Sequence, residues 1–294
     1  MIKLNRNMIA AKCTLAMMIT ALIISIKEEA SAGAWTRNEN SVYAKLAFST
    51  LSTNTFHTKD GDKISTADFQ TWSLDLYGEY GLLDRLTAVV KFPILKKAGF
   101  VTTQSKTGIG DLGLELKYGL VTGSTPVAIG VGVDLPTGDE NGFGLLKDQV
   151  STPGGLVRLP TGDGEFNTRI NVYVSHSFYP VPAYLSIDGG YNFRTKNFTN
   201  EYVFGLQGGY KIAGTVWLQA NLRGMGPVRT PDPDLANGAA LGLGEGVQYT
   251  TYSFGAAYEI IPHYAVSFDF FSAFGKITNI YSGINFVLGV SIEY

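Results

Sequence analysis

The chain has 294 residues, of which 45% are hydrophobic, 12% aromatic and only 16% charged, and its formal net charge is −2. So few charges among so many aromatic residues exclude a disordered chain, and without a basic excess nucleic acid is excluded as the main partner. The length allows one large domain or two small ones.

The first 32 residues have the pattern of an export signal. Three basic residues precede Cys13–Ile26, an apolar run of 14 residues, and the small residues Ala30-Ser31-Ala32 follow it. The run is shorter than the ~20 residues that a membrane-spanning helix needs. We therefore expect a cleaved signal peptide over residues 1–32, rather than a permanent anchor. The remaining domain, residues 33–294, has no cysteine for disulfide bonds or thiol chemistry.

Apolar and polar residues alternate with a period of two along the rest of the chain, which is typical of strands. Near Trp72, for example, Leu74 and Leu76 alternate with Ser73 and Asp75. Twelve such segments are expected, at residues 41–49, 68–80, 85–95, 108–118, 126–135, 165–178, 183–194, 200–212, 215–224, 248–260, 263–274 and 282–294.

The connections between these segments alternate in length. Short joints are expected at 81–84, 179–182, 213–214 and 261–262, and longer polar joints at 50–67, 96–107, 136–164 and 225–247. An even number of strands with this rhythm is typical of outer-membrane barrels, whose short turns face the periplasm. The sequence therefore predicts an all-β protein of the bacterial outer membrane. We expect a transmembrane antiparallel up-and-down β-barrel of about 12 strands with periplasmic termini.

Aromatic residues indicate which face of the strands meets lipid. Most of them lie beside the short joints on the apolar face, where tyrosine keeps its ring in lipid and its hydroxyl in water. The aromatic residues at this level are Tyr80, Tyr118, Phe178, Tyr210, Tyr258, Tyr264 and Tyr294. We read them as an interface girdle, although tyrosine is also a common strand residue.

The last segment alternates apolar residues up to a terminal aromatic, Tyr294. This resembles the signal by which the barrel assembly machinery recognises its clients, although an ordinary edge strand could end in the same way. The expected partners are outer-membrane lipid, this machinery and a small-molecule solute, with no nucleic acid.

Short motifs add a family resemblance. The glycine-rich strand 127–134 runs into Leu135-Pro136-Thr137-Gly138-Asp139, and residues 108–114 form a second glycine-rich strand before it. These sequences resemble the outer-membrane barrel family labelled for the MetA pathway of phenol degradation, and Gly33–Thr36 is similar to the start of XagA-like members. The resemblance implies a membrane barrel with a transport role. A second L-P-T-G-D sequence at 159–163 departs from the pattern.

The polar face of the strands should line the interior. The expected lining residues are Asp75, Glu79, Lys91, Asp111, Glu115, Lys117, Asp134, Arg169, Asp188, Glu201, Lys211, Arg223, Glu259 and Asp269, with Glu293 beside them. Ten of these fifteen residues are acidic and five are basic. Two interpretations stay open: a structural network of ion pairs, or a polar passage whose acidic bias favours cations and neutral solutes.

The lumen should be narrow, because twelve strands fall between the filled barrel of about 8 strands and the open porin of about 16–18. We expect Gly130, Gly132, Gly189 and Gly190 to make room inside or to ease curvature. The connections 136–164 and 225–247 could close the mouth or fold inward.

Neither catalysis nor metal binding is indicated. The three histidines, His57, His176 and His263, are expected in separate places, and no serine–histidine pair with a third polar group is evident. We expect no enzyme, no metal and no cofactor. The sequence favours a narrow passive channel for small solutes, including hydrophobic or aromatic ones. The alternative is a non-conducting barrel that binds a polymer or partner through its long outer connections.

Overall fold

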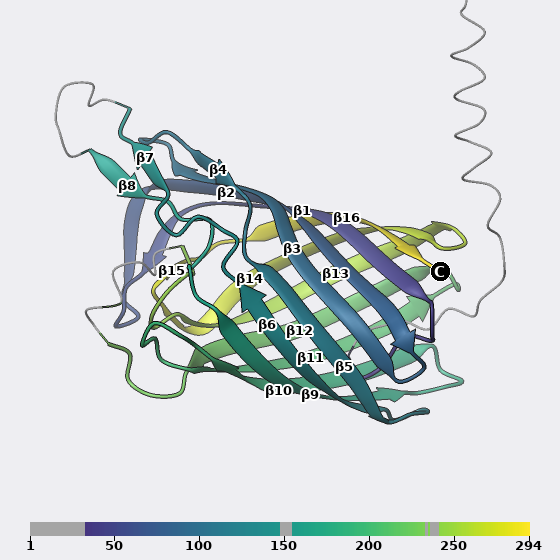
Figure 1. The fold of residues 1–294 in the computed structure, drawn as a ribbon. Helices are drawn as coiled ribbons and strands as arrows, with labels where there is room; N and C mark the ends of the chain where they lie inside the picture. Colours follow the sequence, from purple (N-terminus) through teal and green to yellow (C-terminus); the bar gives the residue numbers. More distant parts are fainter. Residues whose placement is uncertain (1–32, 148–154, 233–234, 236–240) are drawn as a thin grey trace, which may run out of the picture. The chain divides into compact units, whose positions relative to one another are not determined.

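The computed structural model describes residues 33–147, 155–232, 235 and 241–294. These residues form a closed barrel of twelve antiparallel strands (Figure 1). The barrel strands are β1 (Val42–His57), β2 (Lys63–Leu83), β3 (Leu86–Phe100), β5 (Leu112–Val121), β6 (Val127–Leu135), β9 (Asn167–Ser177), β10 (Ala183–Phe193), β11 (Glu201–Ile212), β12 (Val216–Pro227), β13 (Gln248–Ile261), β14 (Tyr264–Thr278) and β16 (Asn285–Glu293). Short accessory strands are β4 (Lys106–Gly108), β7 (Phe143–Leu145), β8 (Leu156–Arg158) and β15 (Ile280–Tyr281). The expected signal peptide, residues 1–32, lies outside the described residues.

The ring closes between the first and the last strand. β1 pairs with β2 on one side and with β16 on the other, and Figure 1 shows purple β1 beside yellow β16. Tyr43 on β1 lies opposite Glu79 on β2 and Glu293 on β16. Closure pairs the strand edges that would otherwise be open to aggregation.

All twelve expected segments coincide with barrel strands, but several strands are longer than expected. Residues 50–67 were expected to form a polar connection, whereas β1 continues to His57 and β2 begins at Lys63. β2 has 21 residues, which at about 3.4 Å per residue spans about 70 Å along the strand. Because the apolar band of such barrels is about 25 Å tall, the outer halves of these strands extend well beyond it.

The barrel is apolar outside and polar inside. Neighbouring residues show the inversion: Leu116 is 52% exposed while Glu115 is 6% exposed, and Val172 is 48% exposed while Asn171 is 9% exposed. A water-soluble barrel would place these residues the other way round. Lipid contact explains the arrangement, since a spanning barrel turns its apolar face outward.

The short turns carry the expected aromatic girdle. Five of the seven expected residues, Tyr80, Tyr118, Phe178, Tyr210 and Tyr258, have exposed side chains on the outer face near these turns. The other two, Tyr264 and Tyr294, are half-buried and share a hydrogen bond between their hydroxyls. In the part of the chain that the structure describes, no helix has the length and apolar character needed to cross a membrane.

Candidate functional site

The segment that precedes β1 enters the barrel at its short-turn end. The backbone N–H of Ala34 donates to Ser175 Oγ (2.9 Å), and that of Arg37 donates to Thr87 Oγ1 (2.8 Å). All four of these residues are buried. Residues 33–37 therefore fill part of the lumen at the end where outer-membrane barrels face the periplasm.

Ion pairs hold this segment in place. Arg37 Nε lies 2.8 Å from Glu79 Oε2, and Arg37 Nη1 pairs with Glu293. Both carboxylates flank Tyr43 in the sheet, so one guanidinium reaches two strands. Lys117 Nζ lies 3.5 Å from Glu79 Oε1. Because charges withdrawn from water need partners, these ion pairs link the segment firmly to the wall.

A central cavity of about 660 Å³ adjoins the segment. Its wall includes the aromatic residues Tyr43, Tyr77, Tyr173 and Tyr249. Its charged lining residues are the basic Lys45, Lys91, Lys117, Arg169 and Arg223 and the acidic Glu79, Glu115 and Asp188. Five basic and three acidic groups reverse the acidic bias that was expected for the interior as a whole.

Glu115 is fixed at the wall of this cavity. Asn171 Nδ2 donates to its Oε2 (2.9 Å), and the Tyr173 hydroxyl donates to its Oε1 (2.8 Å). Gly130 makes the space for this carboxylate, since a Cβ there would lie 2.7 Å from Glu115 Oε1. Gly189, by contrast, would meet nothing nearer than 3.9 Å, so close packing does not require it.

The two L-P-T-G-D sequences pack against each other at the outer end of the barrel. The N–H of Asp139 donates to Thr161 Oγ1, and the N–H of Thr161 donates to the Asp139 carbonyl, both at 2.9 Å. Asp111 accepts from the N–H groups of Gly138 and Asp163, also at 2.9 Å. The repeated motif therefore forms the base of connection 136–164, and the paired strands β7 and β8 extend from it beyond the end of the barrel (Figure 1).

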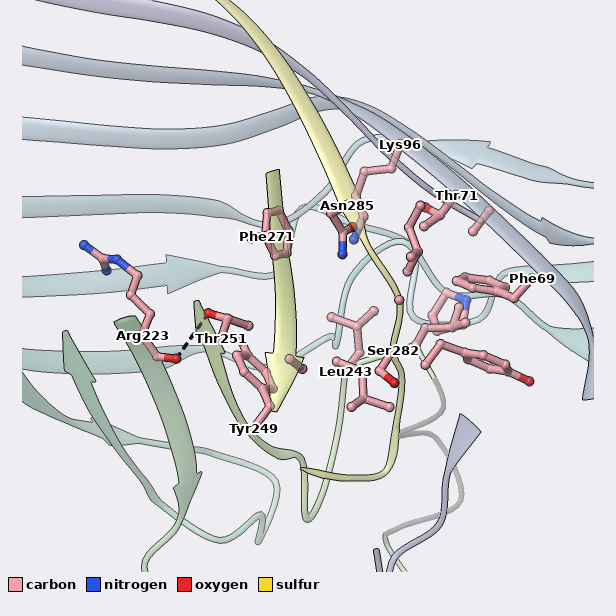
Figure 2. A pocket seen from close by; sticks show the side chains of 18 residues that line it. Phe69, Thr71, Lys96, Arg223, Leu243, Tyr249, Thr251, Phe271, Ser282 and Asn285 are labelled. Carbon is pink, nitrogen blue, oxygen red and sulfur yellow. Dashed lines mark hydrogen bonds between the residues drawn. The ribbon is translucent and has the colours of Figure 1, made fainter. Parts of the chain in front are cut away.

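An outer cavity of about 310 Å³ lies where the two long connections meet the wall. Pro160 comes from one connection and Leu241 and Leu243 from the other. Phe69 stacks on Tyr281 at a centroid distance of 4.7 Å and forms the opposite side. Figure 2 shows this mostly apolar enclosure.

A buried charge cluster joins the outer connections. Arg194 pairs with Glu165 (2.5 Å) and Glu201 (2.7 Å) and donates to the Gly244 carbonyl (2.8 Å). Burial raises the pKa of Glu165 to about 7, although the neighbouring guanidinium opposes the shift. Glu245, fully buried, accepts from the Thr199 N–H and so fixes the connection after β12.

The predicted lining residues divide into two groups. Glu79, Lys91, Glu115, Lys117, Arg169, Asp188 and Arg223 line the central cavity. The remaining seven do not line the central or the outer cavity. Two of them are held by hydrogen bonds: Asp75 accepts from the Ser73 hydroxyl, and Asp111 accepts from the backbone N–H groups described above. The other five, Asp134, Glu201, Lys211, Glu259 and Asp269, lie in ion pairs. These pairs are Arg169–Asp134 (2.8 Å), Arg194–Glu201 (2.7 Å), Lys211–Glu259 (3.6 Å) and Lys45–Asp269 (3.5 Å).

Sequence reasoning missed several charged residues inside the barrel. Lys45 sits on the polar face of a predicted strand, so the period alone could have found it. Arg194 ends the expected segment 183–194 in phase with Asp188, so the period could have found it too. Arg37 lies outside the alternating segments, and its partners are brought to it only by the fold. Among the described residues, no group of three His, Cys, Asp or Glu is placed to hold a metal ion.

Comparison with known proteins identifies solved structures that have a similar architecture. The chain matches no family model and no curated protein sequence. It is similar to the solved COG4313 outer membrane channel from Pseudomonas putida F1, with 14% identity, a TM-score of 0.66, and coverage of 92% of this chain and 100% of that one. A NanC porin is similar at 11% identity and a TM-score of 0.50, with coverage of 86% and 100%. The protein is thus a twelve-stranded β-barrel of the bacterial outer membrane, with the fold of known channels and porins.

Proposed function

We propose that the protein is a narrow passive channel for small solutes, closed at the periplasmic end by residues 33–37. The observation that carries this proposal is the pair of cavities inside one barrel. A central polar cavity of about 660 Å³ and an outer apolar cavity of about 310 Å³ share Arg223 and Tyr249 in their walls. A barrel that served only as a scaffold would have no need of this internal space.

The resemblance to channels and porins supports a transport role at the level of fold. The MetA-pathway resemblance of the L-P-T-G-D strand supports a finer proposal, in which the solutes include hydrophobic or aromatic molecules. The apolar outer cavity is consistent with such solutes, because ligand pockets are mostly apolar with a few convergent polar groups.

Single-channel recording tests the proposal. Purified full-length protein, inserted into planar bilayers, should give discrete current steps. Proteoliposomes should also take up small neutral and aromatic solutes faster than protein-free vesicles. Repeated insertion without current steps or uptake would contradict a channel and favour the non-conducting barrel that recognises a polymer or partner through its outer connections.

A further inference from the structure

The outer cavity has an unusual distribution of charge. Its wall is mostly apolar, with Leu51, Phe69, Leu243 and Phe271 among the lining residues. Two lining residues, Lys96 and Arg223, are cationic, and none of the described lining residues is acidic. The Lys96 ammonium already has a hydrogen-bond partner within the protein, since its Nζ donates to the Thr161 carbonyl (2.9 Å).

Arg223 stands at the boundary between the two cavities. Its nearest acidic partner, Asp188, is 3.8 Å away, and its side chain is 61% exposed although it lies inside the barrel. Figure 2 shows its guanidinium directed away from Phe69 and Leu243. The guanidinium is therefore held loosely and directed toward the central cavity, and because Arg223 lines both cavities, a carboxylate that extends inward from the outer cavity would meet it at their junction.

A second cation lies beyond this boundary. Lys91 lines the central cavity, and its side-chain ammonium makes no hydrogen bond or ion pair with any described residue. Its electrostatic neighbours are Glu115 and Asp134 together with Arg169 and Arg223. Moving inward, a solute therefore meets apolar walls first and accessible positive charge second.

We infer that the two cavities form one binding site for a small amphipathic carboxylate, and this inference rests on the proposed channel function. The apolar body, an aromatic ring or a short alkyl chain, occupies the outer cavity. The carboxylate reaches Arg223, whose planar guanidinium can donate two parallel hydrogen bonds to it. Apolar burial and a charge-assisted hydrogen bond together favour this class over neutral ring compounds and over short carboxylates.

Three related probes test the inference by titration calorimetry. Full-length protein in a non-ionic detergent is titrated with 3-phenylpropionate, with its neutral counterpart 3-phenylpropanol, and with propionate, which lacks the ring. We expect 3-phenylpropionate to bind at least about 10-fold more tightly than either comparator. Binding of 3-phenylpropanol or propionate as tightly as 3-phenylpropionate overturns the inference.

Variants separate the two halves of the site. Arg223→Gln should weaken 3-phenylpropionate binding by about 10-fold or more and leave 3-phenylpropanol unchanged. Phe271→Ala should weaken both ring compounds and leave propionate unchanged. Lys276→Gln is the matched control, because Lys276 is an exposed cation near the same mouth and lines neither cavity.

The outcomes distinguish this inference from the proposed function. Current steps without selective 3-phenylpropionate binding leave the channel standing and overturn the carboxylate site. Selective binding without current supports the site and contradicts the channel. The ranking of the three probes by the unmodified protein decides the inference even if a variant does not fold.

Discussion

The carboxyl group of Glu165 makes the stability of the outer connections depend on pH. Its side chain is fully buried beside Arg194, and burial raises its pKa to about 7 from an ordinary value of 4.5. A raised carboxyl pKa means that the packed state favours the neutral acid. The free energy by which the neutral acid stabilises the packed outer connections is fully present below pH 4.5, and it is lost as the pH rises through about 7.

Acidification should therefore tighten the outer connections. Between pH 8 and pH 4.5, hydrogen exchange of the amides in residues 159–166 and 194–200, corrected for intrinsic rates, should slow by at least about 10-fold. Glu165→Gln, which is neutral at every pH, should abolish this dependence. Glu140→Gln serves as the control, because Glu140 forms an exposed pair with Lys196. An unchanged pH dependence in Glu165→Gln would show that another group controls the connections.

At the scale of elements, the hold of the barrel wall on residues 33–37, which we propose close the periplasmic end, depends on charge. Arg37 satisfies two carboxylates on different strands, and removing it would leave Glu79 buried without its main partner. Glu79 also contacts the Lys117 ammonium (3.5 Å) and accepts from the Tyr77 hydroxyl. Loss of Arg37 therefore weakens the charge balance of this buried group without abolishing it, and the segment and the wall stabilise each other.

Deleting residues 33–40, with the export signal kept, should raise single-channel conductance several-fold. Arg37→Gln should give more frequent openings at the same maximal conductance, since the segment remains but is held less firmly. Glu39→Gln, at an exposed position of the same segment, should behave as the unmodified protein. Equal conductance of the deletion variant and the full chain would place the closing element elsewhere.

The barrel strands were predictable, but their outer ends were not. Within the membrane, apolar and polar faces contrast, so the period of two reveals each strand. Beyond it both faces of a strand meet water or polar loops, and residues such as Thr53, Asn54 and Thr55 show no such contrast. The placement of residues 33–37 inside the lumen was unpredictable for another reason. Arg37 donates hydrogen bonds to Glu79 and Glu293, which are 42 and 256 positions away in the sequence.

The interior was predicted as a set of charges, but not as an arrangement. Alternation places Glu115 and Asp134 on the same inward face. It does not show that Glu115 lines the central cavity while Asp134 is paired with Arg169. The repeated L-P-T-G-D sequence was visible too, yet the pairing of its copies around Asp111 depends on backbone hydrogen bonds that composition does not encode.

For the whole molecule, the apolar exterior is the feature on which membrane residence depends. Val172 lies six residues from the girdle residue Phe178 and points outward, which places it near the middle of the apolar band. Val172→Lys should reduce the free energy of folding into bilayers by about 2–4 kcal/mol. Val181→Lys, in an exposed short turn, should change it by less than ~0.5 kcal/mol.

Urea titration of folding into phospholipid vesicles, followed by tryptophan fluorescence, measures both values. The two variants add the same charge to exposed valines, so only their depth differs. Equal losses for both would mean that the outer face of the barrel does not contact hydrocarbon at the level of Val172.

The length of β2 determines how far the outer cavity lies from the periplasmic girdle. Phe69, in the wall of the outer cavity, lies eleven residues from the girdle residue Tyr80 along this strand. At about 3.4 Å per residue and a tilt of about 40°, that is about 29 Å of height, against an apolar band of about 25 Å. The outer cavity therefore lies just beyond the outer edge of the apolar band, so a solute that binds there, as proposed, does so before it reaches the depth of the acyl chains.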